Sequence, residues 1–166
     1  TFAALKLFID RESWYRVPIY IRTGKMLNTK HTYVVIEFKK FAFQAKEDQP
    51  NRLIVELGPK ERATIKLLNK IRGKAQYLDI STVNSLGISQ EEDLPEHAEL
   101  LLDVFRAQRI YFLSFPEIIA SWRLVDSITD FVNEKKLKPE VYKDGSRGPE
   151  RQDVLTKPDG FEWYDV

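Results

Sequence analysis

Residues 52–68 of the chain read RLIVELGPKERATIKLL. Two β-rich runs, residues 52–57 and 62–68, flank a segment that contains Gly58 and Pro59. Glycine and proline are typical of the turn that joins two adjacent antiparallel strands. The stretch therefore predicts an antiparallel hairpin.

Further β-rich runs lie on both sides of this hairpin, each bounded by turn residues as strands usually are. They cover residues 2–9, 17–22, 32–39 and 76–82. In the third of these runs Val34, Ile36 and Phe38 share one face, because side chains alternate between the two faces of a strand. That face is predicted as core. The opposite face, with Tyr33 and Val35, is mixed.

The second half of the chain changes to the 3.6-residue period of helices. Pro95 is predicted at the first position of one helix, and apolar residues follow it at helical spacing. A second helix is predicted to begin after Ser114, because a capping serine, Pro116 and Glu117 suit the free amides of a first turn. Its apolar stripe is predicted to pack against the sheet.

Runs of strands followed by helices, rather than strict alternation, are typical of an α+β domain. We predict a largely antiparallel sheet with helices packed on one face, and a short helix at residues 150–155 before an aromatic tail. A doubly wound nucleotide-binding fold needs a glycine-rich turn between a strand and a helix. The seven glycines form no G-x-G-x-x-G pattern, so we predict no complete Rossmann domain in this chain.

Composition and charge exclude several classes of function. The 166 residues are 43% hydrophobic, which is typical of one compact domain. Twenty-six Lys and Arg against 25 Asp and Glu leave a net charge of +1, too small to attract nucleic acid or an anionic membrane. The chain has no cysteine and only two histidines, so we predict no metal site. No apolar run approaches the roughly 20 residues of a membrane helix, and we predict a cytoplasmic protein.

The most informative segment for function is residues 17–30, VPIYIRTGKMLNTK, an aromatic-rich strand that runs into a turn. Gly24 is predicted to adopt a positive φ and so to let the chain bend sharply. The bend is expected to bring Lys25 and Lys30 together, and two ammonium groups at the end of a sheet attract a doubly charged phosphate. The alternative is a hairpin end with ordinary surface lysines.

Residues 17–25 and the second lysine resemble a motif of the glucose-6-phosphate dehydrogenase family. Further segments resemble motifs of the same family in the same order: TFAAL at residues 1–5 with Trp14, LLDVF at residues 101–105, SWR at residues 121–123 and YKDGSRGP at residues 142–149. The resemblance runs along the whole chain. It implies that residues 1–166 are the C-terminal part of the family's substrate and dimerisation domain, and the start at Thr1 without an initiator Met agrees with a fragment of a longer protein.

The resemblance also implies a reaction. Members of the family oxidise glucose 6-phosphate to 6-phosphogluconolactone in the pentose phosphate pathway, and hydride passes to NADP or, in some bacterial members, to NAD. Lys25 and Lys30 match the lysines that help to bind the sugar phosphate, and Arg22 matches a position near the substrate. In some eukaryotic members the Arg22 position also lies near a second, structural NADP.

The family's catalytic His, its Asp partner and its cofactor domain lie upstream of the point where this chain starts. We therefore predict no catalytic residue and no cofactor-binding residue in this chain, and no dehydrogenase activity of the chain by itself. Glu56 replaces an Arg of the structural NADP site of animal enzymes, and its negative charge predicts that no second nucleotide binds.

The resemblance further implies a homodimer formed through the sheet. Two readings without catalytic activity stay open beside it. One is an assembly or scaffold domain in which the lysine turn is incidental. The other is an anion-binding module that acts without an upstream domain.

Overall fold

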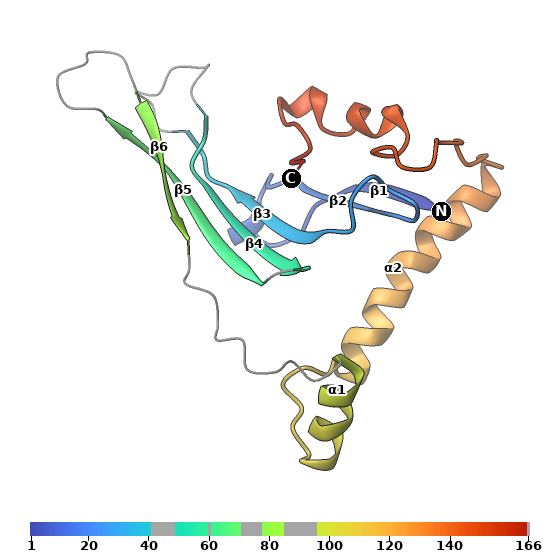
Figure 1. Ribbon diagram of the computed structural model, residues 1–166. Coiled ribbons are helices and arrows are strands. Elements are labelled where there is room, and N and C mark those ends of the chain that lie inside the picture. The colour runs from blue at the N-terminus through green and yellow to red at the C-terminus, as the bar shows by residue number, and fades with distance from the viewer. Residues whose placement is uncertain (41–48, 60, 71–77, 85–95, 166) are drawn as a thin grey trace. The chain divides into compact units, whose positions relative to one another are not determined.

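The computed structural model describes residues 1–40, 49–59, 61–70, 78–84 and 96–165 (Figure 1). The chain divides into two units, one formed by Thr1–Ile88 with Val141–Val166 and the other by Ser89–Glu140. The described strands belong to the first unit, and the described α-helices belong to the second. Antiparallel sheets and helices, with no Rossmann fold in the described part of the chain, confirm the α+β prediction.

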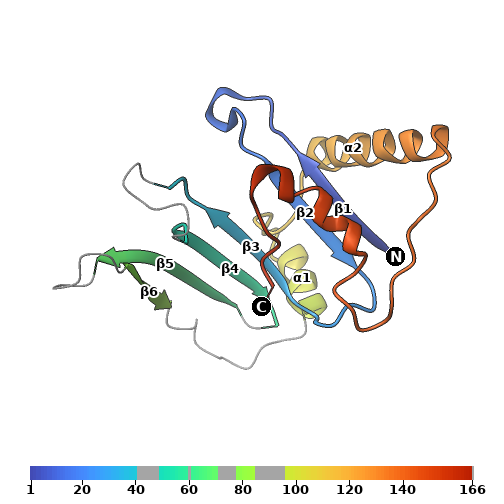
Figure 2. The same ribbon diagram turned by 90° about the horizontal axis from the view of Figure 1, so that it is seen from above.

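Two antiparallel sheets form the first unit (Figure 2). One sheet pairs β1 (Phe2–Leu7) with β2 (Ile19–Gly24). The other has four strands in chain order, which are β3 (Thr32–Glu37), β4 (Arg52–Gly58), β5 (Arg62–Lys70) and β6 (Leu78–Asn84). The hairpin predicted from residues 52–68 is confirmed as β4 and β5, in which Ile54 lies opposite Thr64. The first two positions of the strand predicted at residues 76–82 lie outside the described residues, and the others belong to β6.

The buried face of the four-stranded sheet is opposite to the one predicted. Ile54 and Thr64 are only 1% and 5% exposed, and they share one face. Val34, Ile36 and Phe38 are exposed by 49%, 45% and 49%. The prediction that these three residues form the core is therefore wrong for the first unit.

The C-terminal segment explains which face is buried. It contains two short 3-10 helices, η2 (Glu150–Val154) and η3 (Lys157–Asp159), and then the aromatic tail. The helix predicted at residues 150–155 is thus confirmed in position, with 3-10 geometry. The Tyr164 ring lies 5.6 Å from the Tyr33 ring, and the Lys66 ammonium lies 5.4 Å from the Tyr164 ring centre. Tyr33 and Lys66 lie on the same face as Ile54, so the tail covers that face.

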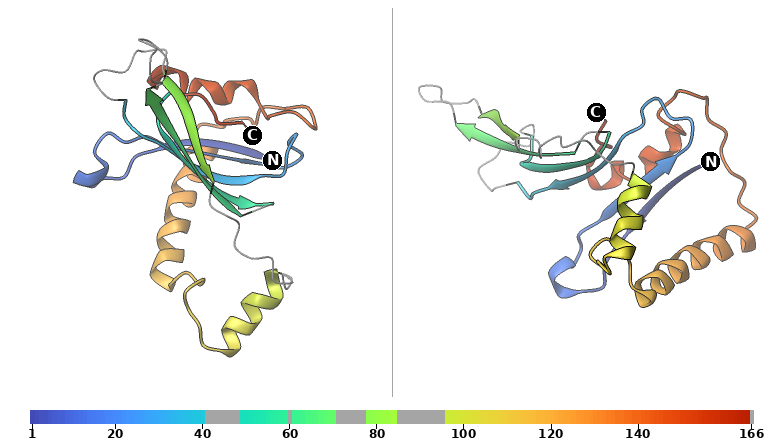
Figure 3. Two further views of the ribbon diagram at one scale, coloured as in Figure 1. Left: turned by 60° about the vertical axis from the view of Figure 1, so that its left-hand side comes forward. Right: turned by 60° about the horizontal axis from the view of Figure 1, so that its bottom comes forward.

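The same tail also contacts β2 of the β1 and β2 pair, whose ribbons are seen in Figure 3. The Tyr20 ring lies 5.8 Å from Phe161 and 6.0 Å from Trp163. Lys6 on β1 and Tyr20 on β2 both bond the Asp159 carboxylate. The aromatic tail therefore links the two sheets of the first unit.

The second unit contains α1 (Glu96–Phe105) and α2 (Phe115–Glu134). The capping box predicted for α2 is confirmed. The Glu117 amide donates to the Ser114 hydroxyl at 3.5 Å, and the Ser114 amide donates to the Glu117 carboxylate at 2.7 Å. These bonds to Ser114 lower the pKa of Glu117. Pro95, predicted to start the first helix, lies outside the described residues.

No residue of α2 is buried, so the packing of its apolar stripe against the sheet stays a prediction. Among the described residues, no helix has the length and apolar character needed to cross a membrane.

Candidate functional site

Lys25 and Lys30 lie on one connection, residues 25–31, which joins β2 to β3. Lys25 directly follows the last residue of β2, and Lys30 precedes β3 by two positions. Both side chains are exposed. Neither ammonium group forms an ion pair or a hydrogen bond with a residue that the structure describes. Two lysines on one short loop are thus available to an anion from solution.

The loop bends at a different residue from the one predicted. Met26 has a φ of 55°, whereas Gly24 is not among the residues with a positive φ. The prediction for Gly24 is therefore wrong. Position 24 needs a glycine for another reason: a Cβ there would lie 2.7 Å from Phe2 Cδ2 and 3.3 Å from the Leu27 side chain. Gly24 allows β1 and the loop to approach closely.

A second glycine contacts the same phenyl ring. Gly148 has a φ of +96°, and a Cβ there would lie 2.5 Å from Phe2 Cε2. The Tyr142 and Phe2 rings meet in an edge-type contact, with ring centroids 5.8 Å apart. Phe2 therefore joins β2 to the YKDGSRGP segment at residues 142–149.

Hydrogen bonds tie this segment to the lysine loop. The Gly145 amide donates to the Met26 carbonyl at 2.9 Å, and the Asn28 amide donates to the Ser146 carbonyl at 2.9 Å. The Tyr142 hydroxyl donates to the Lys25 carbonyl at 2.6 Å. The backbone of the loop is therefore held by a segment from the other end of the chain.

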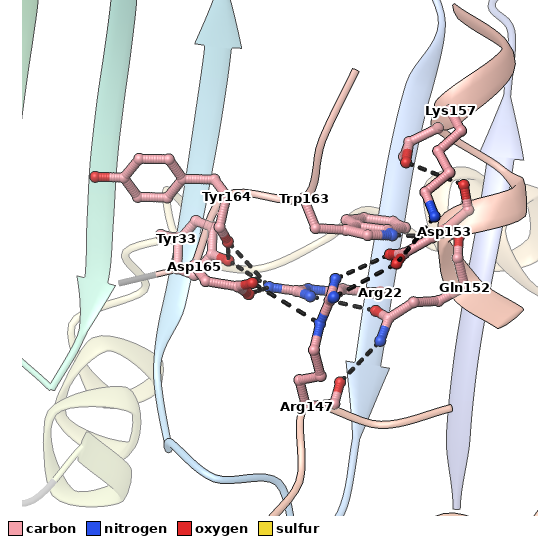
Figure 4. A network of polar contacts seen from close by, with 10 residues as sticks. Arg22, Tyr33, Arg147, Gln152, Asp153, Lys157, Trp163, Tyr164 and Asp165 are labelled. Carbon is pink, nitrogen blue, oxygen red and sulfur yellow. Dashed lines mark hydrogen bonds and ion pairs between the residues drawn. The ribbon is translucent and has the colours of Figure 1, made fainter. Parts of the chain in front are cut away.

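Arg22, unlike the two exposed lysines, lies within a network of polar contacts, which Figure 4 shows. Its side chain is 17% exposed, and its Nη2 donates to the Tyr33 hydroxyl at 3.1 Å, to the Tyr164 carbonyl at 2.9 Å and to the Asp165 carboxylate. Nη1 donates to Gln152 Oε1 at 3.2 Å. Burial lowers the pKa of Arg22, but the bonds to Asp165 and Tyr33 outweigh burial and raise it above its usual value.

The Arg22 guanidinium therefore anchors the C-terminal tail to β2. The Trp163 ring lies against it, 5.0 Å from ring centre to Cζ, and Arg147 approaches the same Asp165 carboxylate at 3.9 Å. A direct contact between Arg22 and a substrate stays a prediction. No local sequence pattern indicates this role, because the partners of Arg22 lie as far as 143 positions along the chain.

We expect Arg22→Ala to lower the free energy of unfolding by about 1.5–3 kcal/mol, because charge-assisted hydrogen bonds in a partly buried site are lost. Arg22→Lys should restore only part of this loss, since an ammonium group cannot bond several partners in one plane. Chemical unfolding of the two variants and the parent protein measures both effects. Equal stability of all three would contradict the anchoring role.

Glu56 is buried and paired. It is 6% exposed, and Arg62 donates to its two carboxylate oxygens at 2.7 and 2.8 Å. The hydrogen bonds from Arg62 lower the pKa of Glu56. Its charge is therefore compensated inside the chain, so the repulsion expected from Glu56 toward a second nucleotide is weaker than the sequence predicted.

This pairing predicts a pH dependence. A carboxyl group whose pKa is lowered by folding stabilises the fold above its ordinary pKa, and the contribution is lost as the pH falls through the lowered pKa. Glu56→Gln should therefore lower the melting temperature at about pH 7 and change it much less at about pH 3. Thermal unfolding of both proteins at the two pH values tests this. A melting-temperature difference that does not change with pH would contradict it.

The described residues contain no group of three or more His, Cys, Asp and Glu side chains that could hold a metal ion. The His31 ring lies edge-on to Tyr33 at 5.3 Å, and His97 is exposed at the start of α1. Within the described part of the chain, the exposed ammonium groups of Lys25 and Lys30 are groups suited to an anion.

Fold and loop together define an α+β domain in which the connection between two strands presents two exposed lysines. A family model described as glucose-6-phosphate dehydrogenase, C-terminal domain, matches residues 1–164. The chain belongs to this family, which confirms the resemblance seen in the sequence motifs.

Individual relatives agree with the family. The chain is 34% identical over 174 residues to glucose-6-phosphate 1-dehydrogenase of Bacillus subtilis, with 100% of this chain and 35% of the relative covered. It is 32% identical over 176 residues to the chloroplastic glucose-6-phosphate 1-dehydrogenase 3 of Arabidopsis thaliana, covering 100% of this chain and 29% of the relative.

A solved structure of glucose-6-phosphate dehydrogenase in complex with its substrate glucose-6-phosphate matches with a TM-score of 0.82 and 26% identity. The match covers 99% of this chain and 35% of that chain. The chain thus spans about a third of the length of the relatives it matches.

Proposed function

We propose that this chain is the phosphate-binding part of a glucose-6-phosphate dehydrogenase, and that residues 1–166 belong to its C-terminal substrate and dimerisation domain. The observation that carries the proposal is the loop between β2 and β3. Lys25 and Lys30 are exposed there without partners among the described residues, while the loop backbone is fixed by hydrogen bonds. Family membership and the solved relative with bound glucose-6-phosphate support a sugar phosphate as the anion.

The proposed reaction is oxidation of glucose 6-phosphate to 6-phosphogluconolactone, with hydride transfer to a nicotinamide dinucleotide. We propose NADP as the acceptor, with NAD as the alternative, and a place in the pentose phosphate pathway. Phosphate binding contributes to this chemistry although the two lysines do not contact the reacting carbon. Interactions with a nonreacting group hold the sugar in the orientation that the transition state requires.

A kinetic assay of the full-length protein tests the proposed activity. Glucose 6-phosphate is supplied with NADP or with NAD, and the reduced nicotinamide is followed by its absorbance. We expect reduction that depends on the sugar phosphate. No reduction of either cofactor would favour the anion-binding module or the scaffold domain.

A second proposal concerns assembly. Ile65 and Leu67 on β5 are each 40% exposed, and they share a face of the sheet with Val34 and Ile36. Exposed apolar residues that cluster on one face are typical of protein interfaces. We propose that the full-length protein forms a homodimer through this sheet, and light scattering after size-exclusion chromatography tests it. A monomer at high concentration would contradict the dimer. A cytoplasmic location stays a prediction from the sequence.

A further inference from the structure

The Tyr142 hydroxyl bonds the main chain of the lysine that the proposed function uses. It donates to the Lys25 carbonyl at 2.6 Å and reaches the Thr1 carbonyl at 3.2 Å. Its ring packs edge-on against Phe2 at 5.8 Å. The ring is thus positioned by β1, and the hydroxyl bonds the first residue after β2.

The backbone of Lys25 is fixed on both sides. Its amide donates to the Thr1 carbonyl at 2.9 Å, and its carbonyl accepts from Tyr142. The next residue, Met26, has the unusual φ of 55°, and its carbonyl accepts from the Gly145 amide at 2.9 Å. A residue other than glycine with positive φ is held by its surroundings, because the conformation is unfavourable by itself.

The side chain of Lys25, by contrast, has no partner among the described residues. Its direction depends on its own backbone, since the backbone fixes the Cα–Cβ bond from which the side chain extends. Loss of the bond to the Lys25 carbonyl would free the peptide that links Lys25 to Met26. The ammonium group would then sample a larger volume, and binding an anion would cost more conformational entropy.

We propose that Tyr142 is a positioning residue for the phosphate-binding Lys25. The proposal rests on the proposed function, because it concerns the same loop. Tyr142 does not touch the sugar phosphate in this account. It acts through the Lys25 backbone, and so it should affect substrate binding more than turnover.

The test is Tyr142→Phe in the full-length enzyme, which removes the hydroxyl and keeps the ring on Phe2. A neutral hydrogen bond corresponds to about a 3- to 10-fold change in affinity. We expect KM for glucose 6-phosphate to rise by about that factor, with kcat changed less than about twofold and KM for the cofactor unchanged. Tyr15→Phe is the matched control, since Tyr15 is 70% exposed in the same unit, and its KM should equal that of the parent.

A double variant shows whether the effect passes through Lys25. If it does, adding Tyr142→Phe to Lys25→Ala should raise KM less than about twofold beyond Lys25→Ala alone, because coupled residues are not additive. An unchanged KM in Tyr142→Phe, beside a raised KM in Lys25→Ala, would overturn this proposal and leave the proposed function standing. Independent effects that multiply would also overturn it. An unchanged KM in Lys25→Ala would overturn both.

Discussion

Lys25→Ala in the full-length enzyme is expected to raise KM for glucose 6-phosphate by about 10- to 100-fold. A hydrogen bond between charged groups contributes about 1.5–3 kcal/mol, which corresponds to that range of affinity. Lys30→Ala should act in the same direction, because Lys30 lies on the same exposed loop. Steady-state kinetics with varied sugar phosphate measure both variants.

Lys138→Ala provides the control for this prediction. Lys138 is an exposed lysine that follows α2 in the second unit, so its removal changes the net charge equally but leaves the loop intact. Its KM should equal that of the parent enzyme. Equal KM values for the parent, Lys25→Ala and Lys30→Ala would show that the two lysines are ordinary surface residues.

Gly148→Ala is expected to lower the free energy of unfolding by about 2–5 kcal/mol, because a strained backbone and an overpacked site add together. The φ of +96° is unfavourable for alanine, and the new Cβ would lie 2.5 Å from Phe2 Cε2. Either the ring or the turn must move, and both hold the lysine loop. Chemical unfolding measures the loss of stability.

Gly145→Ala separates the two causes. Gly145 also has a positive φ, +74°, but a Cβ there would meet no atom within 4 Å. Gly145→Ala should lower the free energy of unfolding by only about 1–2 kcal/mol, because the positive φ is unfavourable for alanine. Adding Phe2→Leu to Gly148→Ala should destabilise by less than the sum of the single changes, because the two residues touch. Equal losses in Gly145→Ala and Gly148→Ala would contradict the contact with Phe2.

Features encoded by neighbouring residues could be predicted from the sequence. The hairpin of β4 and β5 depends on a turn of few residues between alternating runs, and the cap of α2 depends on Ser114 and Glu117, which are one helical turn apart. The lysine loop was found through motif resemblance for a similar reason: its residues are contiguous.

Features that depend on distant segments could not be predicted in this way. The sequence predicts the bend at Gly24, whereas in the structure Gly24 permits the close approach of Phe2 and the positive φ belongs to Met26. Tyr142 meets Lys25 across 117 positions of sequence. The buried face of the four-stranded sheet is the one that the C-terminal tail covers. Alternation of side chains along a strand does not predict which of its two faces a distant segment covers.

The most direct test of the account compares two substrates, glucose 6-phosphate and glucose, in the parent enzyme and in the Lys25→Ala/Lys30→Ala double variant. If the loop binds the phosphate, kcat/KM for glucose 6-phosphate should fall by about 100-fold or more, while kcat/KM for glucose changes less than about threefold. Equal losses on both substrates would contradict the account, because they would place the effect of the lysines outside phosphate binding.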